Sequence, residues 1–467
     1  MADNTARWSK YVAQSGKPAY LAIADAIAAD MQAGRLAANE NLPPLRALAS
    51  ELGLNYTTVA RAYAEARRRG LVDARSGRGT FVKPASSTTA PVRSLGFVGL
   101  VEMTMNLPPE PQDPALMLRM QNGLAELQQR MDMHELLRYQ DFGGTRADRE
   151  AGIRLLEPHL PGLAPERVLV CPGVQSALLA LISVLVRPGE VMCTEALTYP
   201  GAKAIASHLG VELVGLPLDA EGIDPEAFAA ACAKHAPKAL YLNPTLLNPT
   251  TAVMSEARRL AVAETARQHN VWIIEDDAYG LLPARAPRTI AELAPESTFY
   301  VSGLAKFVGA GLRIAYLAAP DARQAQRIAT TLRAMTVMAS PITTALSTRW
   351  IEDGTAHAIL GAVREESARR QRLAAQALPA GSYASQPEAF HLWLALPPHW
   401  SRVEFAAHLR ARGIGVVGSD SFAVTETPPQ AVRVCLGGAV DRHQCRTALD
   451  LIAGVLEQHP AVASGVM

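Results

Sequence analysis

One lysine in this chain stands where it could act as a nucleophile. Lys306 lies in the stretch SGLAKFVGAGLRIAY (302–316) among small and apolar residues, and Arg313 follows seven positions later. Lysine is scarce here, with seven lysines against 38 arginines. A lysine held among apolar groups loses solvation as a cation, so its pKa falls and the neutral amine can condense with an aldehyde. Considered alone, Lys306 could also be an ordinary surface lysine, and Arg313 could form a salt bridge.

The chain carries candidates for the groups that an aldehyde cofactor needs. Pyridoxal 5′-phosphate (PLP), the commonest such cofactor, requires a phosphate clamp, an anion at its ring nitrogen, a donor to its ring hydroxyl and a group stacked on its ring. Arg313 has the planar guanidinium that suits phosphate, and the helix predicted to open at Val174, Gln175 and Ser176 offers an anion its free amides. The remaining candidates are the acidic residues of EDD (275–277) with Tyr279 behind them, Asn248 in NPTT and Tyr199 in LTYPG.

Each of these residues also has an ordinary structural role. The acidic residues can cap a loop, VQSA can open any helix, and Tyr199 can serve packing alone. The site is favoured because all the candidates lie at the predicted ends of strands, where ligands bind in open α/β sheets.

Buried-strand patterns alternate with helical patterns from about residue 104 onwards. Helical stretches such as 255–270 separate short apolar runs, which predicts an α/β fold with a mostly parallel sheet and helices on both faces. The last hundred residues predict a smaller α+β part. The predicted strands are 167–171, 190–194, 239–243, 271–277, 298–303 and 313–319, and the smaller part contains 391–397, 403–413 and 431–437.

Composition divides the chain into three regions. Residues 1–83 are helical and basic, with 12 Lys and Arg against 7 Asp and Glu, whereas the remainder has 33 against 37. Residues 84–103 are a predicted linker that starts with PASSTTAPVRSL, and 104–467 form the α/β domain, with a small subdomain from about 340. The basic excess suggests that only the first region meets a polyanion, although a chance imbalance of surface charge would look the same.

The basic region predicts a winged helix-turn-helix. Helical spacing covers 18–36 and 42–53, and Asn55 is expected to cap a third helix by accepting from the amide of Thr57 or Thr58. Two strand-like pieces in LVDARSGRGTFV (71–82) flank Ser-Gly-Arg-Gly, which predicts a hairpin, or wing, with a basic tip.

The polar side chains of this region favour DNA as its partner. The first turn of a recognition helix points at base edges, and arginines at the preceding helix and at the wing tip suit phosphate, guanine or the minor groove. A helical bundle that binds protein is the alternative. The candidate DNA-binding residues are Arg46, Asn55, Tyr56, Thr57, Thr58, Arg61 and Arg78.

Residues 15–83 resemble the winged-helix domain of GntR-type bacterial regulators. The matching pieces are LPPLRALASELGLNYTTVARAY and GLVDARSGRGTFV. The resemblance implies that Gly77 lies at the DNA together with Arg46, Asn55, Tyr56, Thr57, Arg61 and Arg78.

Residues 104–460 resemble the fold-type I, class I aminotransferases. The resemblance implies that Lys306 bonds to the PLP aldehyde, that Arg313 binds its phosphate, and that Asp276, three positions before Tyr279, faces the ring nitrogen. It further implies that Arg433 in VRVCLG clamps a carboxylate and that Tyr139 in YQDFGG reaches the phosphate of the neighbouring subunit, hence a dimer. The other residues matched to cofactor contacts are Asn248, Tyr199, Val174 and Gln175.

The chain departs from the pattern of this family at several positions. Gly303 and Ala305 stand where the family usually has hydroxyl residues, Ser302 is one position early for a phosphate contact, and Thr251 replaces the glycine of NPTG. An altered cofactor affinity or geometry is therefore expected.

The two modules together resemble the MocR family of bacterial transcriptional regulators. This implies a homodimer whose large domain binds PLP and senses an amino compound or PLP itself. We therefore expect a regulator of double-stranded operator DNA in which Lys306 bonds to PLP and an effector amine displaces it. The alternatives are a working aminotransferase with a DNA-binding appendage and a DNA-binding dimer with an inactive sensor domain.

Composition excludes several other classes of protein. At 49% hydrophobic and 19% charged residues the chain is globular rather than disordered. Five scattered cysteines without a CxxC pair predict neither a zinc site nor a disulfide framework. The N-terminus lacks the apolar core of a signal peptide, and the longest apolar run (177–186) is too short to span a bilayer, so a cytoplasmic protein without a membrane partner is expected.

Overall fold

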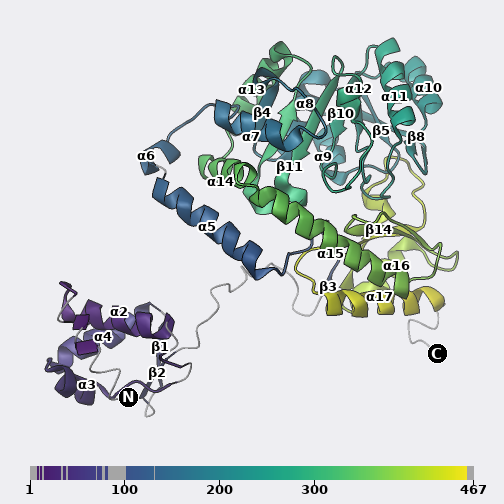
Figure 1. Ribbon diagram of the computed structural model, residues 1–467. Helices are drawn as coiled ribbons and strands as arrows, with labels where there is room; N and C mark the ends of the chain where they lie inside the picture. Colours follow the sequence, from purple (N-terminus) through teal and green to yellow (C-terminus); the bar gives the residue numbers. More distant parts are fainter. Residues whose placement is uncertain are drawn as a thin grey trace. The chain divides into compact units, whose positions relative to one another are not determined.

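The computed structural model divides the chain into two compact units, residues 1–97 and 98–467, each with its own hydrophobic core (Figure 1). No helix in the described part of the chain is long and apolar enough to cross a membrane. The structure describes residues 8–9, 11–12, 15–32, 35–37, 40–69, 71–75, 79–82, 101–130 and 132–459.

The first unit is a three-helix module followed by a hairpin. Helices α2 (Ala19–Gln32) and α4 (Tyr56–Arg68) pack together, and α3 (Leu45–Leu52) ends at Gly53, whose left-handed φ of 63° suits glycine. Strands β1 (Val72–Arg75) and β2 (Gly79–Val82) pair antiparallel. The helix-turn-helix and the wing strands therefore form as the sequence predicts.

The second unit is built on a seven-stranded sheet. All its strands run parallel except β12, which pairs antiparallel with both neighbours, so the predicted mostly parallel α/β fold is confirmed. The sequence pattern did not predict the edge strand β6, whose first four residues are not buried. In spatial order the strands are β4 (Val168–Cys171), β12 (Ala315–Ala318), β11 (Thr298–Gly303), β10 (Trp272–Asp276), β9 (Ala239–Leu242), β5 (Val191–Glu195) and β6 (Glu212–Leu216).

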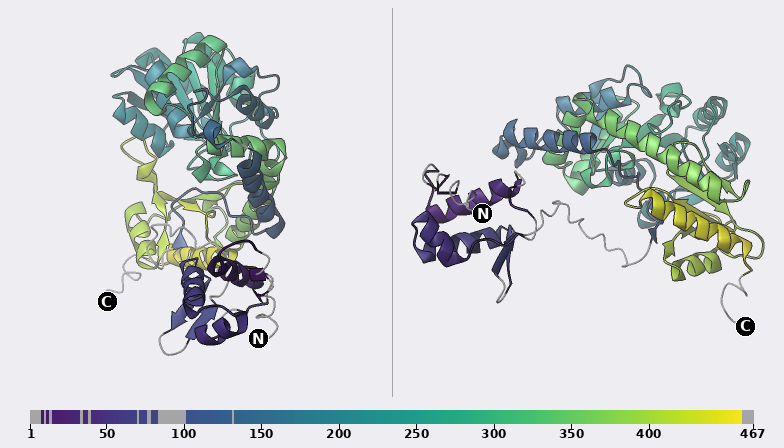
Figure 2. Two further views of the ribbon diagram at one scale, coloured as in Figure 1. Left: turned by 90° about the vertical axis from the view of Figure 1, so that its left-hand side faces the viewer. Right: turned by 60° about the horizontal axis from the view of Figure 1, so that its bottom comes forward.

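Helices cover both faces of this sheet, as the views in Figure 2 also show. Ile274 of β10 packs with the helices of one face, and its neighbour Ile273 packs with those of the other. This alternation, with a period of two residues, decides which strand residues can meet a ligand on a given face. One face carries α8 (Val174–Leu185), α9 (Pro200–His208) and α13 (Ala322–Thr336), and the other carries α7 (Arg146–Leu156), α10 (Pro225–His235), α11 (Glu256–Gln268) and α12 (Ile290–Leu293).

A smaller sheet forms a separate subdomain within the second unit. Its antiparallel order is β13 (Tyr383–Ala384), β14 (His391–Ala395), β17 (Ala431–Cys435) and β16 (Val417–Gly418). Helix α15 (Thr355–Ala377) runs from the large part to this subdomain, where it packs on α17 (Arg442–Glu457) (Figure 1). Strand β3 (Val101–Glu102), from the beginning of the unit, joins the same subdomain by pairing in parallel with β15 (Ile414–Gly415).

The other elements connect these layers. Helix α14 packs on α7 and on α5. The remaining bounds are α5 (Pro114–Arg130), α6 (Met133–Leu136), α14 (Pro341–Glu352), α16 (Arg402–Ala411), β7 (Leu218–Asp219), β8 (Gly222–Ile223), η1 (Pro165–Arg167), η2 (Leu304–Lys306), η3 (Ala310–Leu312) and η4 (Ser419–Ser421).

Candidate functional site

A cavity of about 340 Å³ lies where the parallel strands of the large sheet end. Asn243 follows β9, Asp276 ends β10 and Gly303 ends β11, and all three line it. The structure therefore brings together, at the carboxyl edge of the sheet, residues that are up to 328 positions apart, from Met105 to Arg433. The predicted site residues that line the cavity are Val174, Gln175, Tyr199, Asn248, Asp276, Tyr279, Lys306, Arg313 and Arg433.

Lys306 presents its amine to this cavity from the short helix η2. Its Nζ donates a hydrogen bond to the carbonyl oxygen of Asn106 (2.7 Å) and lies 5.3 Å from the centroid of the Tyr279 ring. Burial, followed by repulsion from Arg433, lowers the pKa of Lys306 to about 8. At that pKa roughly one amine in ten is neutral at pH 7, which makes Lys306 a competent nucleophile.

Asp276 is the carboxylate of the cavity. Tyr241 donates to its Oδ2 (2.8 Å) and the Ala278 amide donates to its Oδ1 (3.3 Å). Burial nevertheless raises the pKa of Asp276 to about 6, against the lowering effect of these bonds and of Lys306. A cationic partner in the cavity would relieve that desolvation, because an opposite charge favours the ionised carboxylate.

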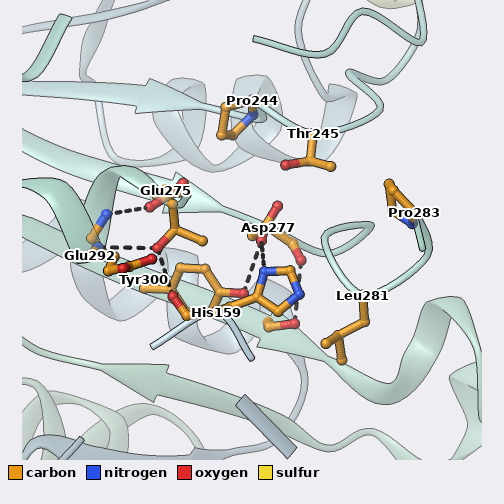
Figure 3. A network of polar contacts seen from close by, with 12 residues as sticks. His159, Pro244, Thr245, Glu275, Asp277, Leu281, Pro283, Glu292 and Tyr300 are labelled. Carbon is orange, nitrogen blue, oxygen red and sulfur yellow. Dashed lines mark hydrogen bonds and ion pairs between the residues drawn. The ribbon is translucent and has the colours of Figure 1, made fainter. Parts of the chain in front are cut away.

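The two acidic neighbours of Asp276 do not line the cavity and belong to a separate network of polar contacts, which Figure 3 shows. Asp277 accepts from Tyr300 Oη (2.9 Å) and lies 3.8 Å from Nδ1 of His159. Glu275 accepts from the amides that open α12 and lies 3.5 Å from the buried Arg259. Strand alternation thus leaves Asp276 as the member of EDD that faces the cavity.

The opposite end of the cavity is suited to an anion. Helix α8 begins there without a side-chain cap, so its first amides are available, and Gly173 precedes it with a φ of 85°. A methyl group added to Gly173 would lie 3.0 Å from an Arg313 guanidinium nitrogen, which places that cation beside the helix N-terminus.

At the same end of the cavity, positions 174, 303 and 305 are occupied by Val, Gly and Ala, which have no hydroxyl group. A Cβ on Gly303 would meet Val174 Cγ2 at 2.8 Å, so the valine fills the space that a serine side chain at 303 would need. Arg313 and the α8 amides are left as the main anion-binding groups.

Arg433 is the fourth charged residue that lines the cavity, after Lys306, Asp276 and Arg313. It donates from one terminal nitrogen to Asn248 Oδ1 (2.6 Å) and from the other to the Thr104 carbonyl oxygen. Its guanidinium carbon lies 4.9 Å from the Phe422 ring centroid, and its buried Nε has no hydrogen-bond partner within the described residues. Both of these acceptors are uncharged. A carboxylate accepts more strongly from a guanidinium, so it could replace them as the partner of Arg433.

The aromatic and amide groups complete the walls of the cavity. Gln175 Nε2 donates to Tyr199 Oη (3.3 Å), and burial raises the pKa of the Tyr199 phenol. Asn243 donates to the Asp276 carbonyl oxygen (2.6 Å) and accepts from the Asn248 amide (2.9 Å), so it holds two site residues in register.

Two residues of the predicted site lie elsewhere. Ser302 is outside the cavity lining: alternation along β11 turns its hydroxyl to the other face, where it donates to the Asp277 carbonyl oxygen (3.3 Å). Tyr139 is 79% exposed and lines a separate groove of about 520 Å³ beside α14. Thr251 is buried with a left-handed φ of 64°, a conformation that disfavours a β-branched residue.

Some cavity residues were not identified from the sequence. Asn243 is the last residue of the predicted strand 239–243, and a polar residue at the end of a strand is the available signal. Asn106 carries no local pattern, although its side chain donates to Tyr279 Oη (2.9 Å) and its carbonyl oxygen accepts from Lys306. The others of this group are Met105, Leu107, Pro200, Ala278, Ala310 and Ile314.

The residues present fit PLP. The cavity combines an amine of lowered pKa, a buried carboxylate, a guanidinium at an uncapped helix N-terminus and a second guanidinium with an unpartnered Nε. These are the groups that the aldehyde, the ring nitrogen, the phosphate and an incoming carboxylate each require. No group of three or more potential metal ligands occurs among the residues that the structure describes.

The first unit presents its candidate DNA-binding side chains on α3 and α4. Arg46, Asn55, Tyr56, Thr57 and Arg61 are exposed and Thr58 is half-buried. Asn55 occupies the N-cap position of α4, but its side chain makes no capping bond, so that expectation is wrong. The backbone carbonyl of Asn55, rather than its side chain, accepts the Thr58 amide (3.0 Å). Gly77 and Arg78 lie outside the described residues.

Arg61 is positioned by a neighbouring aromatic ring. Its guanidinium carbon lies 4.4 Å from the centroid of Tyr20 on α2. A cation–π contact of this kind orients the side chain while leaving its donors available.

Comparison with known proteins gives two family matches. Residues 103–452 match the model for aminotransferase class I and II, and residues 19–82 match that for bacterial regulatory proteins of the gntR family. The HTH-type transcriptional regulator YdeF of Bacillus subtilis is 29% identical over 91% of this chain and 92% of its own length. The vitamin B6 salvage pathway transcriptional repressor PtsJ of Salmonella typhimurium is 26% identical over 92% and 96%.

A solved structure supports the fold of the second unit. The α-aminoadipate aminotransferase LysN from Thermus thermophilus superposes with a TM-score of 0.69 at 21% identity, covering 77% of this chain and 92% of LysN. Its fold is that of the unit which contains the cavity.

Proposed function

We propose that this chain, which belongs to the aminotransferase class I and II family and carries the GntR-type module of MocR-subfamily regulators, is a PLP-binding transcriptional regulator. The single observation that carries the proposal is the convergence of Lys306, Asp276 and Arg313 on one cavity, in a chain that also contains a helix-turn-helix.

Each wall of the cavity has a role toward PLP. Arg313 and the first amides of α8 would hold the phosphate, Asp276 the ring nitrogen, and Asn248 and Tyr279 the ring hydroxyl. Tyr199 would cover a face of the ring, with Val174 and Gln175 at the phosphate turn. When bound, PLP supplies an aldehyde that condenses with a primary amine, with loss of water, and a ring that withdraws electrons.

The residues of this chain prepare that chemistry before any ligand enters. Lys306 has its pKa lowered by burial and by Arg433, so it offers a neutral amine. Asp276 holds a negative charge where the ring nitrogen needs one to keep its proton. Arg433 would receive the carboxylate of an effector, exchanging a neutral amide and a carbonyl for a charged partner.

The effector proposed here is an amino compound with a carboxylate, or PLP itself. Arg433 favours the first, since it lies in the same cavity as Lys306. The similarity to PtsJ, a repressor of vitamin B6 salvage, favours the second.

Double-stranded DNA is the proposed partner of the first unit. The exposed first turn of α4 would read base edges, and Arg46 and Arg61 would contact phosphate or guanine. A ligand in the cavity would regulate transcription by changing the affinity of the protein for its operator DNA.

A homodimer is also part of the proposal. Exposed apolar side chains gather on α5 and on the segment of α6 that leads to Tyr139. A second copy would cover them and bring its Tyr139 to the phosphate end of this chain's cavity. The residues concerned are Met117, Leu118, Leu124, Met133 and Leu137.

Aminotransferase turnover is the second candidate function. The presence of Lys306, Asp276 and Arg433 in one cavity favours it, because lysine would also shuttle the proton at the substrate carbon. The missing hydroxyls at 303 and 305 and the left-handed Thr251 favour sensing over turnover.

Absorbance and mass mapping test the cofactor site. We expect added PLP to produce a visible band, and borohydride to convert it into a stable adduct on Lys306. The PLP-binding part of the proposal would be refuted if the wild type formed neither the band nor the adduct and if Lys306→Ala behaved in the same way. Conversion of an amino acid and a 2-oxo acid at many turnovers would favour the enzyme instead.

A further inference from the structure

A short segment, Val101–Leu107, connects the cavity to the part of the chain that leads to the DNA-binding unit. It is the first described stretch after residue 82. Its beginning, β3, pairs with β15, and the Val101 amide donates to the Gly413 carbonyl oxygen (2.7 Å). Met103 is fully buried in the core of the small subdomain. Figure 1 shows β3 beside this subdomain, far in sequence from its other strands.

The end of this segment lines the cavity and binds both of its reactive cations. The Asn106 carbonyl oxygen accepts from Lys306 Nζ (2.7 Å), and the Thr104 carbonyl oxygen accepts from Arg433. Cys435 Sγ also lies 3.7 Å from the Thr104 carbonyl oxygen. The two groups proposed to receive PLP and a carboxylate are therefore both hydrogen-bonded to one backbone segment.

The Asn106 side chain adds a second attachment at the same place. Its Nδ2 donates to Tyr279 Oη (2.9 Å) and lies 3.3 Å from Nδ1 of His391. Burial, with repulsion from Arg433, lowers the pKa of His391 to about 3, so that ring is neutral and can accept. The buried Oδ1 of Asn106 has no partner within the described residues, so the side chain is held by its amide nitrogen alone.

Ligand binding competes with these attachments. If its nitrogen condensed with an aldehyde, with loss of water, Lys306 would keep fewer N–H donors for the Asn106 carbonyl. A carboxylate on Arg433 is a stronger acceptor than the Thr104 carbonyl. A carbonyl left buried without a donor is costly, so the segment must find new partners or move.

We infer that Val101–Leu107 is a latch: it is held closed by Lys306, Arg433 and Tyr279, and its release reports cavity occupancy to the DNA-binding unit. The inference rests on the proposed function, because it names how the same cavity regulates DNA binding. In this inference Asn106 is a positioning residue, because its side chain fixes the segment to Tyr279 and His391. Linkage requires the converse as well: DNA binding must change the affinity for PLP by the same factor.

The test compares Asn106→Ala with wild type and with Gln112→Ala. Gln112 is a suitable control because it is exposed, lies outside the cavity and, among the described residues, donates only to the Glu110 carbonyl oxygen. The probe is PLP alone, and the DNA is a labelled duplex selected from random sequence by the full chain. Three quantities are measured on each protein: the Lys306 adduct, the Kd for DNA without PLP and the Kd with PLP.

We expect PLP to change the DNA Kd of wild type and of Gln112→Ala by about tenfold, within the usual range of allosteric coupling. In Asn106→Ala the ratio of the two Kd values should fall to about one, while the Lys306 adduct still forms. A ratio equal to that of wild type, with the adduct present, would overturn the latch and leave the proposed function standing. A wild type without adduct or without DNA binding would overturn both.

Amide hydrogen exchange of the wild type, with and without PLP, tests the latch without any variant, so the result does not depend on whether Asn106→Ala folds. We expect PLP to accelerate exchange of the Val101 amide by about tenfold, because release of the latch weakens its bond to Gly413. Unchanged exchange at Val101 in a protein that carries the Lys306 adduct would contradict the latch.

Discussion

The lowered pKa of Lys306 makes a quantitative prediction about cofactor capture. Only the neutral amine attacks an aldehyde, so the rate of capture follows the neutral fraction of Lys306. An ordinary lysine, with a pKa near 10.5, would be neutral roughly once in 3,000 molecules at pH 7. With a pKa of about 8 the fraction is roughly one in ten, an advantage of roughly 300-fold.

The pH profile follows from the same value. Capture should accelerate about tenfold per pH unit up to about pH 8 and then level off, because above that pH nearly every Lys306 is already neutral. Two variants shift the midpoint in opposite directions. Arg433→Gln removes a cation that lowers the pKa of Lys306, so its midpoint moves up; Asp276→Asn removes an anion that raises it, so its midpoint moves down.

Stopped-flow absorbance on mixing the ligand-free protein with PLP between pH 6 and pH 10 measures this profile. The profile of free lysine with PLP under the same conditions corrects for titration of the cofactor itself. A protein profile that keeps rising to pH 10, parallel to that of free lysine, would refute the burial argument for Lys306. Midpoints that move in the same direction in both variants would refute the assignment of its charged neighbours.

Three further predictions follow from the site and from the DNA-binding unit. Arg313→Gln should weaken PLP binding by about 10- to 100-fold, since a charge-assisted bond is lost, yet leave binding of unphosphorylated pyridoxal unchanged in equilibrium titrations; an equal loss for both would contradict the phosphate role. Asp276→Asn should weaken PLP binding by a similar factor, whereas Asp219→Asn, on the exposed β7 strand, should not, as measured by the same titrations. Arg46→Ala should weaken DNA binding across sequences and reduce the salt dependence by about one charge in anisotropy titrations, and an unchanged slope would argue against a phosphate contact.

Much of the site could be predicted because its residues stand at regular places along the chain. Lys306, Asp276 and Val174 each follow or end an apolar strand, and parallel strands bring such ends to one edge. The choice of Asp276 over Asp277 rested on its spacing to Tyr279, and strand alternation gives it a physical reason. The same period of two places Ser302 on the opposite face from Gly303, a signal that the sequence already contained.

The rest depends on contacts that no local pattern contains. Asn106 meets Lys306 across 200 positions and His391 across 285, and its neighbours in sequence show no periodicity. Asn55 shows a different limit: its residue type favours a capping bond, but its side chain makes none in the structure. Tyr139 illustrates a third limit, because its proposed site lies on a second copy of the chain.

We expect PLP bound at Lys306 to change the affinity of this chain for DNA. The most direct measurement is fluorescence anisotropy of a labelled duplex, selected by the full chain, titrated with wild type and Lys306→Ala in the absence and presence of PLP. We expect PLP to shift the binding curve of wild type by about tenfold and to leave that of Lys306→Ala in place. Superimposable curves for wild type with and without PLP, in a protein that carries the Lys306 adduct, would contradict it.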